Sequence, residues 1–264
     1  MRFDVITLFP ELFAPFLSAG INRRAFETGA VELKLWQLRD YADGTYRRVD
    51  DRPFGGGPGM VLLAEPLEKC LQAIRHDRAL KNPYEKPVPV VLFSPIGQPL
   101  NHAGAEEWSQ SDGAILICGR YEGLDQRFID AHVDVQVSLG DFVLSGGEIA
   151  AIALLDAVAR LQPGVLNDEG SHQMDSFNPA LDGLLDCGHF TRPEVWKDIT
   201  VPPVLMSGHH AEITKWRRQQ SLVLTQKYRP DLIVGARLAG KLSTQDENFL
   251  FSLSASGLVE SKSN

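Results

Sequence analysis

The sequence predicts an α/β domain with a mainly parallel sheet, followed by a smaller, mostly helical domain. Strand-like runs alternate with amphipathic stretches over residues 1–161, a pattern typical of α/β domains. The runs at 88–94 and 113–118 are short and continuously apolar, as in strands buried on both faces of a parallel sheet. Residues 162–178 are polar and aperiodic, with one proline and two glycines, and predict a domain boundary.

The expected elements follow in order along the chain. Strands are expected at residues 2–8, 31–38, 88–94, 113–118 and 133–139, and helices at 10–29, 66–80, 102–110, 124–131 and 147–161. Pro10 suits the first turn of its helix, which we expect to be interrupted at Pro15, and Asn101 is expected to cap the helix that follows it. The second domain is expected to contain a helix at 211–228 and one or two more within 231–253.

These patterns divide the chain into three parts. Residues 1–162 form the expected α/β domain, residues 163–177 a flexible linker, and residues 178–264 the helical domain. The chain has 264 residues and a net charge of −8, which is not typical of a nucleic-acid binder. The acidity is uneven: residues 177–264 hold ten Lys/Arg and nine Asp/Glu, whereas residues 1–176 hold 16 and 25. Contact with a polyanion would therefore depend on local basic clusters.

The sequence also bears on the cellular compartment. The N-terminal segment lacks the pattern of a secretory signal, and no stretch approaches 18 uncharged apolar residues, so a membrane span is not expected. The three cysteines, Cys70, Cys118 and Cys187, are odd in number and far apart. They indicate a reducing compartment and form no metal-ligand pattern. We expect a cytoplasmic protein with no structural metal.

Four glycine-containing turns adjoin the expected strands, at residues 50–60, 94–97, 118–123 and 138–148. Ligands of open α/β sheets bind beyond the carboxyl ends of the strands, so these turns could surround one ligand. None has the GxGxxG spacing of a dinucleotide-binding loop. The alternative interpretation is that each is a tight connection in which glycine supplies a positive φ.

The turn DDRPFGGGPGM (50–60) differs chemically from a phosphate loop. A phosphate loop presents free backbone N–H groups and usually a lysine, whereas Pro53 and Pro58 remove donors, and Asp50 and Asp51 would repel an anion. Carboxylates beside a closely approaching backbone better suit a ligand rich in hydrogen-bond donors. A guanine edge is one such ligand.

Three further groups of residues have both a structural and a functional interpretation. Arg160 lies four residues after Asp156 and can complement the helix dipole, or it can stabilise negative charge in a site. The carboxylates and imidazole of the linker are either solvated or functional; they belong to Asp168, Glu169, His172 and Asp175. The segment KWRR (215–218) is either a solvated helix face or a phosphate-backbone contact.

Taken together, these segments resemble the bacterial tRNA (guanine-N1)-methyltransferases (the TrmD family) of the knotted SPOUT methyltransferase superfamily. The resemblance covers nearly the whole chain. The segments that carry it, in order, are LFPE (8–11), VDDRPFGGGPGM (49–60), SPIG (94–97), CGRYEG (118–123), SLGDFVLSGGE (138–148), PGVL (163–166), DSF (175–177), GLLDCGHFTRPE (183–194) and VPPVLMSGHHAEI (201–213).

The resemblance implies a deep trefoil knot in the first domain, a homodimer with active sites at its interface, and S-adenosylmethionine as the methyl donor. The implied cofactor-binding residues are Phe93, Ser94, Pro95, Gly97, Gly119, Tyr121, Glu122, Ser138, Leu139, Leu144, Gly146 and Gly147. The family pattern has Tyr at Phe93, Ile at Leu139 and Tyr at Phe142, so side-chain hydroxyl contacts are lost at the first and last of these positions. A magnesium requirement is also implied, although no residue in this sequence stands out as its ligand.

The same resemblance implies a reaction and roles for the remaining residues. Guanine N1 becomes a good nucleophile when a base removes its proton while negative charge gathers on O6. By matching positions, Asp175 is the general base and Arg160 stabilises O6, and the linker becomes a lid over the site. Residues Asp50, Arg52 and Gly59 would position the target base, from the same subunit or its partner. Residues Lys215, Arg217 and Arg218 would hold the anticodon arm of tRNA.

The implied target is the guanosine at position 37, next to the anticodon, where methylation maintains the reading frame. Two alternatives stay open from the sequence. The first is another SPOUT methyltransferase that modifies a different nucleotide or a ribose hydroxyl of RNA. The second is a non-catalytic RNA-binding protein built on the same scaffold.

Overall fold

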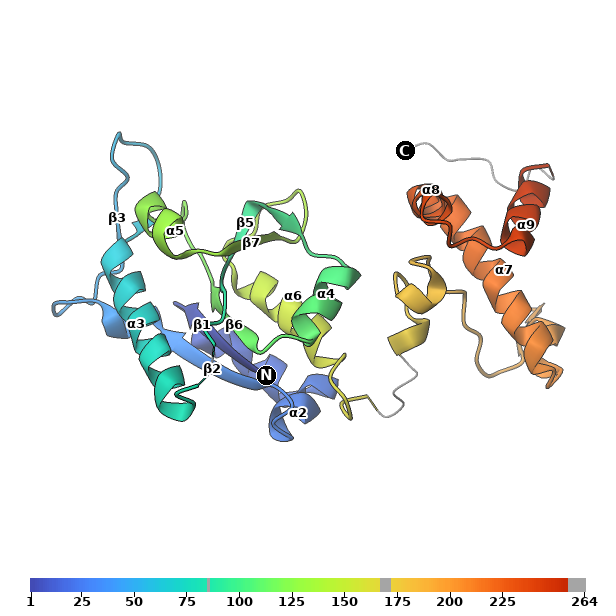
Figure 1. Ribbon diagram of the computed structural model, residues 1–264, viewed down its shortest axis with the longest axis horizontal. Coiled ribbons are helices and arrows are strands. Elements are labelled where there is room, and N and C mark those ends of the chain that lie inside the picture. The colour runs from blue at the N-terminus through green and yellow to red at the C-terminus, as the bar shows by residue number, and fades with distance from the viewer. Residues whose placement is uncertain (85, 167–171, 256–264) are drawn as a thin grey trace. The chain divides into compact units, whose positions relative to one another are not determined.

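The computed structural model describes residues 1–84, 86–166 and 172–255. The chain forms two compact units, Met1–Asn167 and Asp168–Asn264 (Figure 1). The first unit contains a five-stranded sheet whose strands are all parallel. Its spatial order is β2 (Glu32–Gln37), β1 (Arg2–Thr7), β6 (Gly113–Ile117), β5 (Val90–Pro99) and β7 (Val135–Ser138). The predicted α/β class with a parallel sheet is confirmed.

The two faces of the sheet pack against different helices (Figure 1). Successive side chains of a strand point to opposite faces, and β1 illustrates this: Phe3 and Val5 belong to one buried cluster and Ile6 to the other. The first cluster includes the apolar side of α6 (Glu148–Ala159) and the second that of α3 (Ala64–Lys81). The central strands are apolar on both faces because helices cover both.

The other elements of this unit complete these two layers. They are η1 (Pro10–Phe13), α1 (Ala14–Ser18), α2 (Gly20–Glu27), η2 (Leu38–Tyr41), α4 (His102–Ser109), α5 (Gln126–His132) and the short antiparallel pair β3 (Asp50–Asp51) and β4 (Val61–Leu62). The predicted cap of α4 is confirmed, because Asn101 Oδ1 accepts a hydrogen bond of 2.9 Å from the backbone N–H of Gly104.

A helix at residues 10–29 with an interruption at Pro15 was expected, and the expected position of the interruption is wrong. Pro15 lies within the first turn of α1, where its missing N–H leaves no hydrogen bond unmade. The chain instead breaks at Ala19, whose φ of −123° and ψ of 155° are extended, and Gly20 follows with a φ of +62°. Glycine adopts this left-handed conformation without the Cβ clash that other residues meet, so the break falls here.

Strand β5 extends further than the sequence indicated. Its pairing with β7 skips from Phe93 to Gln98, so the intervening residues bulge out of the ladder. A bulge at the end of a strand redirects side chains and often borders a binding site. The bulge of β5 contains the predicted turn at residues 94–97.

The second unit is mostly helical. Its helices are η3 (His172–Met174), η4 (Pro179–Leu181), η5 (Pro203–Met206), α7 (His210–Tyr228), α8 (Pro230–Leu238) and α9 (Thr244–Ala255), and a short hairpin joins β8 (Val195–Trp196) to β9 (Ile199–Thr200). Leu222 of α7, Ile233 of α8 and Leu250 of α9 meet in its buried core. Within the predicted linker, residues 172–174 form η3, and the buried Asn178, just after the linker, donates its side-chain N–H to the carbonyl of His172.

A buried network of charges joins the first strand to α3. The fully buried Asp4 carboxylate accepts hydrogen bonds from Arg2, Arg78 and Trp36 Nε1. Arg2 also binds Asp77, 2.7 Å away. Hydrogen bonds from Lys34 and then Arg2 lower the pKa of Asp77 from 3.8 to about 2. A buried carboxylate needs this many partners, because an unpaired one would cost several kcal/mol.

We predict that Asp77 stabilises the fold in a pH-dependent way. Because folding lowers the pKa of Asp77, its contribution is complete above pH 3.8 and is lost as the pH falls through about 2. The melting temperature of Asp77→Asn should therefore lie below that of the wild type at pH 6, and the gap should narrow at pH 3. An equal gap at both pH values, measured by circular dichroism, would contradict this assignment.

Candidate functional site

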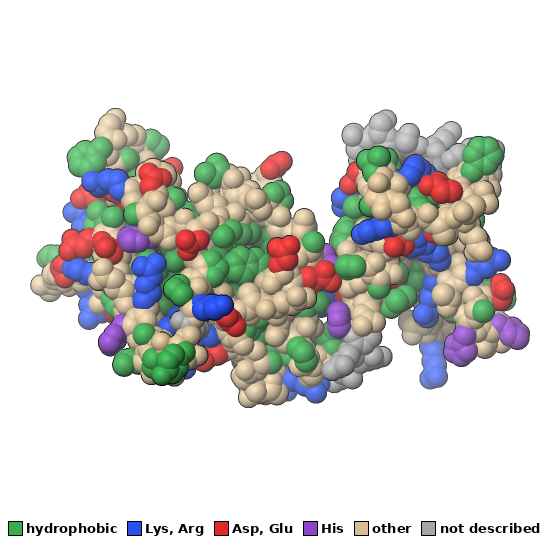
Figure 2. All heavy atoms as spheres, viewed as in Figure 1, with side chains coloured by type: hydrophobic (Ala, Val, Ile, Leu, Met, Phe, Trp, Pro, Cys, Tyr) green, Lys and Arg blue, Asp and Glu red, His purple; other side chains and the backbone are tan. Residues whose placement is uncertain are grey.

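A cavity of about 400 Å³ lies at the carboxyl ends of β5, β6 and β7. Three segments form its walls: the start of the β5 bulge, the loop 119–124 after β6, and the loop 138–147 after β7. Strands that run parallel end at the same edge of a sheet, so their following loops converge there. This placement is the one expected for a ligand of an open α/β sheet. Hydrophobic side chains are also visible on this part of the first unit, over β5 and β7 (Figure 2).

The structure brings the predicted cofactor residues together. Those that line the cavity are Phe93, Ser94, Pro95, Gly119, Tyr121, Glu122, Ser138, Leu139, Leu144, Gly146 and Gly147. Gly97 is not in the lining. A Cβ atom at Gly97 would overlap the backbone of Val137, so this glycine lets the bulge approach β7 closely and thereby shapes the wall.

Other lining residues are not among the individually predicted cofactor-binding residues, although half of them lie within the glycine-containing turns 118–123 and 138–148. They are Leu92, Arg120, Gly123, Leu124, Gln126, Ile129, Val137, Gly140, Phe142, Val143, Ser145 and Ala150. Gln126 and Ile129 lie three residues apart on α5 and so share one face of that helix. Ala150 lies in the first turn of α6. Helical periodicity could have selected these three once the helices were known to flank the glycine turns.

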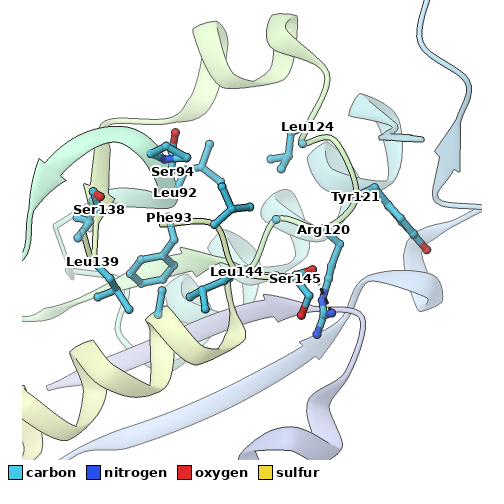
Figure 3. Close-up of a pocket in the computed structure, with 18 of the residues that line it drawn as sticks. Leu92, Phe93, Ser94, Arg120, Tyr121, Leu124, Ser138, Leu139, Leu144 and Ser145 are labelled. Carbon is cyan, nitrogen blue, oxygen red and sulfur yellow. Dashed lines mark hydrogen bonds between the residues drawn. The ribbon is translucent and has the colours of Figure 1, made fainter. Parts of the chain in front are cut away.

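The walls differ in character from one side to the other. Phe93, Leu139 and Leu144 present an apolar group, and Ser94 and Ser138 lie next to it (Figure 3). The Ser138 hydroxyl accepts a hydrogen bond of 3.1 Å from the backbone N–H of Gly140, which fixes the start of the 138–147 loop. An apolar slot with a few fixed polar groups suits a small aromatic ligand.

The DDRPFGGGPGM turn lies directly beside this cavity. The backbone N–H of Glu122 donates to the carbonyl of Met60 over 3.0 Å. Gly59 has a φ of +80°, and a Cβ atom there would overlap the Glu122 carboxylate. Asp50 pairs with Leu62 in the β3–β4 ladder, and Arg52 is exposed. None of Asp50, Arg52 and Gly59 lines the cavity itself, but the turn that holds them borders it at Glu122.

Arg160 lies at the opposite end of α6 from the cavity. Ala150 lines the cavity, and a helical rise of about 1.5 Å per residue places the Arg160 backbone roughly 15 Å further along the axis. The Asp156 carboxylate, its expected structural partner, accepts a hydrogen bond from Asn22 Nδ2. The cavity and Arg160 of one chain are therefore separated by most of a helix.

The remaining predicted residues belong to the second unit. Asp175 follows η3, and its backbone N–H donates to the carbonyl of His172, whereas Asp168 and Glu169 lie outside the described residues. Lys215 and Arg217 are exposed on α7. Arg218 differs from them, because its half-buried guanidinium binds Asp246 with two bonds of 3.0 Å and Asp182 at 2.8 Å. These bonds tie α7 to α9 and to the turn after η4.

The cysteines are not suited to nucleophilic chemistry. All three are free and buried. Burial raises the pKa of Cys70 to about 12, and burial followed by the negative charge of Glu148 raises the pKa of Cys118 well above its usual value. Burial also raises the pKa of Cys187. A thiol reacts as its thiolate, so these side chains act as small apolar core residues.

The part of the chain that the structure describes contains no cluster of three or more His, Cys, Asp or Glu side chains arranged to hold a metal ion. The implied magnesium requirement therefore stays a prediction without an assigned site. Within the same residues, no helix combines the length and apolar character needed to cross a membrane.

Comparison with known proteins identifies the family of the chain. A family model described as "tRNA (Guanine-1)-methyltransferase TrmD" matches residues 1–235. The chain belongs to this family. Relatives named tRNA (guanine-N(1)-)-methyltransferase are found in several bacteria. One from Polaromonas sp. (strain JS666 / ATCC BAA-500) is 70% identical over 96% of this chain and 97% of its own length. A relative from Paracidovorax citrulli is 66% identical and one from Bordetella pertussis is 54% identical. Each match covers 96% of this chain and 98% of the relative.

We predict that Gly97 determines the shape of the cavity in this TrmD-family protein. Gly97→Ala should lower stability by about 1–3 kcal/mol, the usual cost of overpacking, and should weaken ligand binding in the cavity. Gly104→Ala is the matched control, because a Cβ there meets only ordinary contacts on helix α4. Chemical denaturation that shows the same stability for both variants would refute the close-approach interpretation.

Proposed function

We propose that this chain transfers a methyl group from S-adenosylmethionine to N1 of the guanosine at position 37 of tRNA. The observation that carries the proposal is the convergence of the predicted loops on one cavity in a chain of the TrmD family. Relatives that align over nearly their whole length are named for guanine N1 methylation of tRNA. The target position and the methyl donor rest on the family resemblance of the sequence.

The cavity has the chemistry that the methyl donor requires. Phe93, Leu139 and Leu144 offer an apolar slot for an adenine ring. The 138–147 loop brings backbone N–H and C=O groups to the edge of this slot, where they can bind the ring nitrogens. Glu122 is exposed at the border with the Gly59 turn, where its carboxylate suits the positive or donor groups of the ligand. The bound donor supplies an electrophilic methyl group.

Two side chains would act on the guanine. Asp175 would accept the N1 proton, which leaves a lone pair on N1 for the methyl group. Arg160 would donate to O6, where the resulting negative charge collects. Asp50 and Arg52, on the turn next to Glu122, would bind the base edge and hold N1 in line. The predicted linker, 163–177, would act as a lid over the site when both ligands are bound.

A homodimer would bring these parts together. Apolar side chains are exposed near the cavity, with Phe142 55%, Val143 88% and Ile149 55% exposed. Leu12 of η1 is 43% exposed, and Phe9, which directly precedes η1, is 37% exposed. A patch of this kind on a soluble protein usually marks an interface. With Arg160 about 15 Å along α6 from Ala150, a partner subunit could supply the O6 stabiliser to each cavity.

Further parts of the proposal follow from the resemblance to SPOUT enzymes. The loops after β6 and β7 would form the trefoil knot, and backbone hydrogen bonds between them across β5 support this arrangement, such as Gly147 N–H to the Gly119 carbonyl at 2.9 Å. The second unit would bind the anticodon arm, and cationic side chains are visible on its surface (Figure 2). A cytoplasmic location and a magnesium requirement complete the proposal.

The target nucleotide can be tested with tRNA transcripts that carry guanosine, inosine or adenosine at position 37. Methyl transfer from labelled S-adenosylmethionine should occur with guanosine and inosine, which both have an N1 proton and O6, and not with adenosine. Inosine should react more weakly, because it lacks the 2-amino group that a carboxylate can bind. Methylation confined to another nucleotide or to a ribose would favour a different SPOUT activity.

We predict that Asp175→Ala abolishes methyl transfer while S-adenosylmethionine still binds. Loss of a general base typically costs about 10²–10⁴-fold in rate. Asp198→Asn, at an exposed carboxylate of the same unit, is the matched control and should leave the rate unchanged. Full activity of Asp175→Ala would remove this residue from the mechanism. A wild-type chain that binds no S-adenosylmethionine in calorimetry would instead favour a non-catalytic RNA-binding protein.

The basic residues of α7 should separate into two classes. Lys215→Ala and Arg217→Ala should raise the KM for tRNA and reduce the salt dependence of binding by about 0.7–0.9 log units per log unit of salt for each lost phosphate contact. Their melting temperatures should match the wild type. Arg218→Ala should lower the melting temperature, because it leaves Asp246 and Asp182 without their cation. A stable Arg218→Ala protein would contradict its structural role.

A further inference from the structure

A buried carboxylate lies just behind the cavity. Glu148, the first residue of α6, is 1% exposed. Its Oε1 accepts a hydrogen bond of 2.9 Å from the Thr7 hydroxyl, at the end of β1, and its Oε2 lies 2.9 Å from Arg120 Nε, on the loop after β6. Thr7 and Glu148 are not among the cavity-lining residues, and none of the three side chains belongs to the sites predicted from the sequence.

These contacts connect loops that the sheet does not connect. Strand β5 lies between β6 and β7, so the ladders do not join the loops that follow those two strands. The backbone of Arg120 instead forms an isolated antiparallel β-bridge with that of Gly146 across the end of β5. The side-chain Nη1 of Arg120 donates to the Ser145 carbonyl over 3.2 Å. Figure 3 shows the Arg120 side chain directed to Ser145 and away from Phe93 and Leu139.

Close packing leaves the side chains of Thr7, Arg120 and Glu148 little room to move. A Cβ atom at Gly146 would overlap both Arg120 and Glu148. The Thr7 hydroxyl also accepts a hydrogen bond of 2.9 Å from the backbone of Phe9, and the Arg120 guanidinium lies 4.5 Å from the centre of the Phe9 ring. A buried ion pair adds little net stability, because desolvation offsets its attraction, but removing one partner exposes a large penalty. The pair can therefore fix a geometry without being needed for folding.

We propose that Thr7, Arg120 and Glu148 are positioning residues that hold the 119–124 and 138–147 loops at the separation required by the methyl donor. This inference rests on the proposed function, in which the cavity binds S-adenosylmethionine. Thr7 and Glu148 act only through the loops, because they lie behind the wall. Their loss weakens binding of the donor while the groups that act on guanine stay in place.

The inference is tested by calorimetry of S-adenosylmethionine on the full-length chain. Glu148→Gln should raise the Kd for S-adenosylmethionine at least tenfold. Thr7→Val should raise it about threefold. In methyl-transfer assays they should raise the KM for the donor more than they lower kcat. The double variant Arg120→Met/Glu148→Leu removes both charges and so leaves neither one buried alone. Its melting temperature should therefore lie closer to the wild-type value than that of Glu148→Gln, while its Kd should stay at least tenfold above that of the wild type. Recovery of both would show that the pair serves stability alone and would overturn the proposal.

Asp77→Asn is the matched control, because it breaks an ion-pair network that joins α3 to strands β1 and β2 of the same sheet, away from the cavity. It should lower the melting temperature and leave the Kd unchanged. Equal weakening of binding by Asp77→Asn, or an unchanged Kd in both Thr7→Val and Glu148→Gln, would refute the inference. Failure of the wild type to bind S-adenosylmethionine would refute the proposed function itself, so the two failures are distinguishable.

Discussion

The parallel pairing of β5 with both β6 and β7 is the constraint on which the candidate site depends. Parallel strands end at one edge, so three loops distant in sequence converge there and enclose the cavity. Covering helices on both faces make this pairing stable, since an exposed parallel sheet would leave apolar faces in water. The glycines then adjust the fit: Gly97 admits the backbone of β7, and Gly59 admits Glu122.

Buried charge is used in two ways in the first unit. Around Asp4, several donors satisfy one carboxylate and join β1 to its neighbour β2 and to α3. Around Glu148, a single ion pair and one hydroxyl join loops that no ladder connects. The group around Asp4 satisfies a buried charge where backbone hydrogen bonds already join β1 to β2. The group around Glu148 crosses the end of β5, where a backbone bridge of Arg120 with Gly146 also joins the two loops, so its side chains reinforce the spacing that this short pairing begins.

Sequence reasoning succeeded where the cause is local or repeated. The alternation of strand-like and helical segments predicted the parallel sheet, and the position of Asn101 predicted that it caps α4. The motif positions predicted residues that line one cavity. It missed features set by distant partners. The bonds of Arg218 to Asp182 and Asp246 cross 28 to 36 residues, and those of Thr7 to Glu148 cross 141. No periodicity relates such pairs, so only the folded chain reveals them.

If the three converging loops bind the methyl donor, their backbone amides should become protected when it is added. Hydrogen–deuterium exchange of the full-length chain, with and without S-adenosylmethionine, measures this protection, because backbone amides report binding at each loop separately. Added protection is expected in peptides that cover residues 93–98, 119–124 and 138–147, with little change in α7 and α8. Protection confined to the second unit, or none in the three loops when the donor is saturating, would show that these loops do not bind the donor.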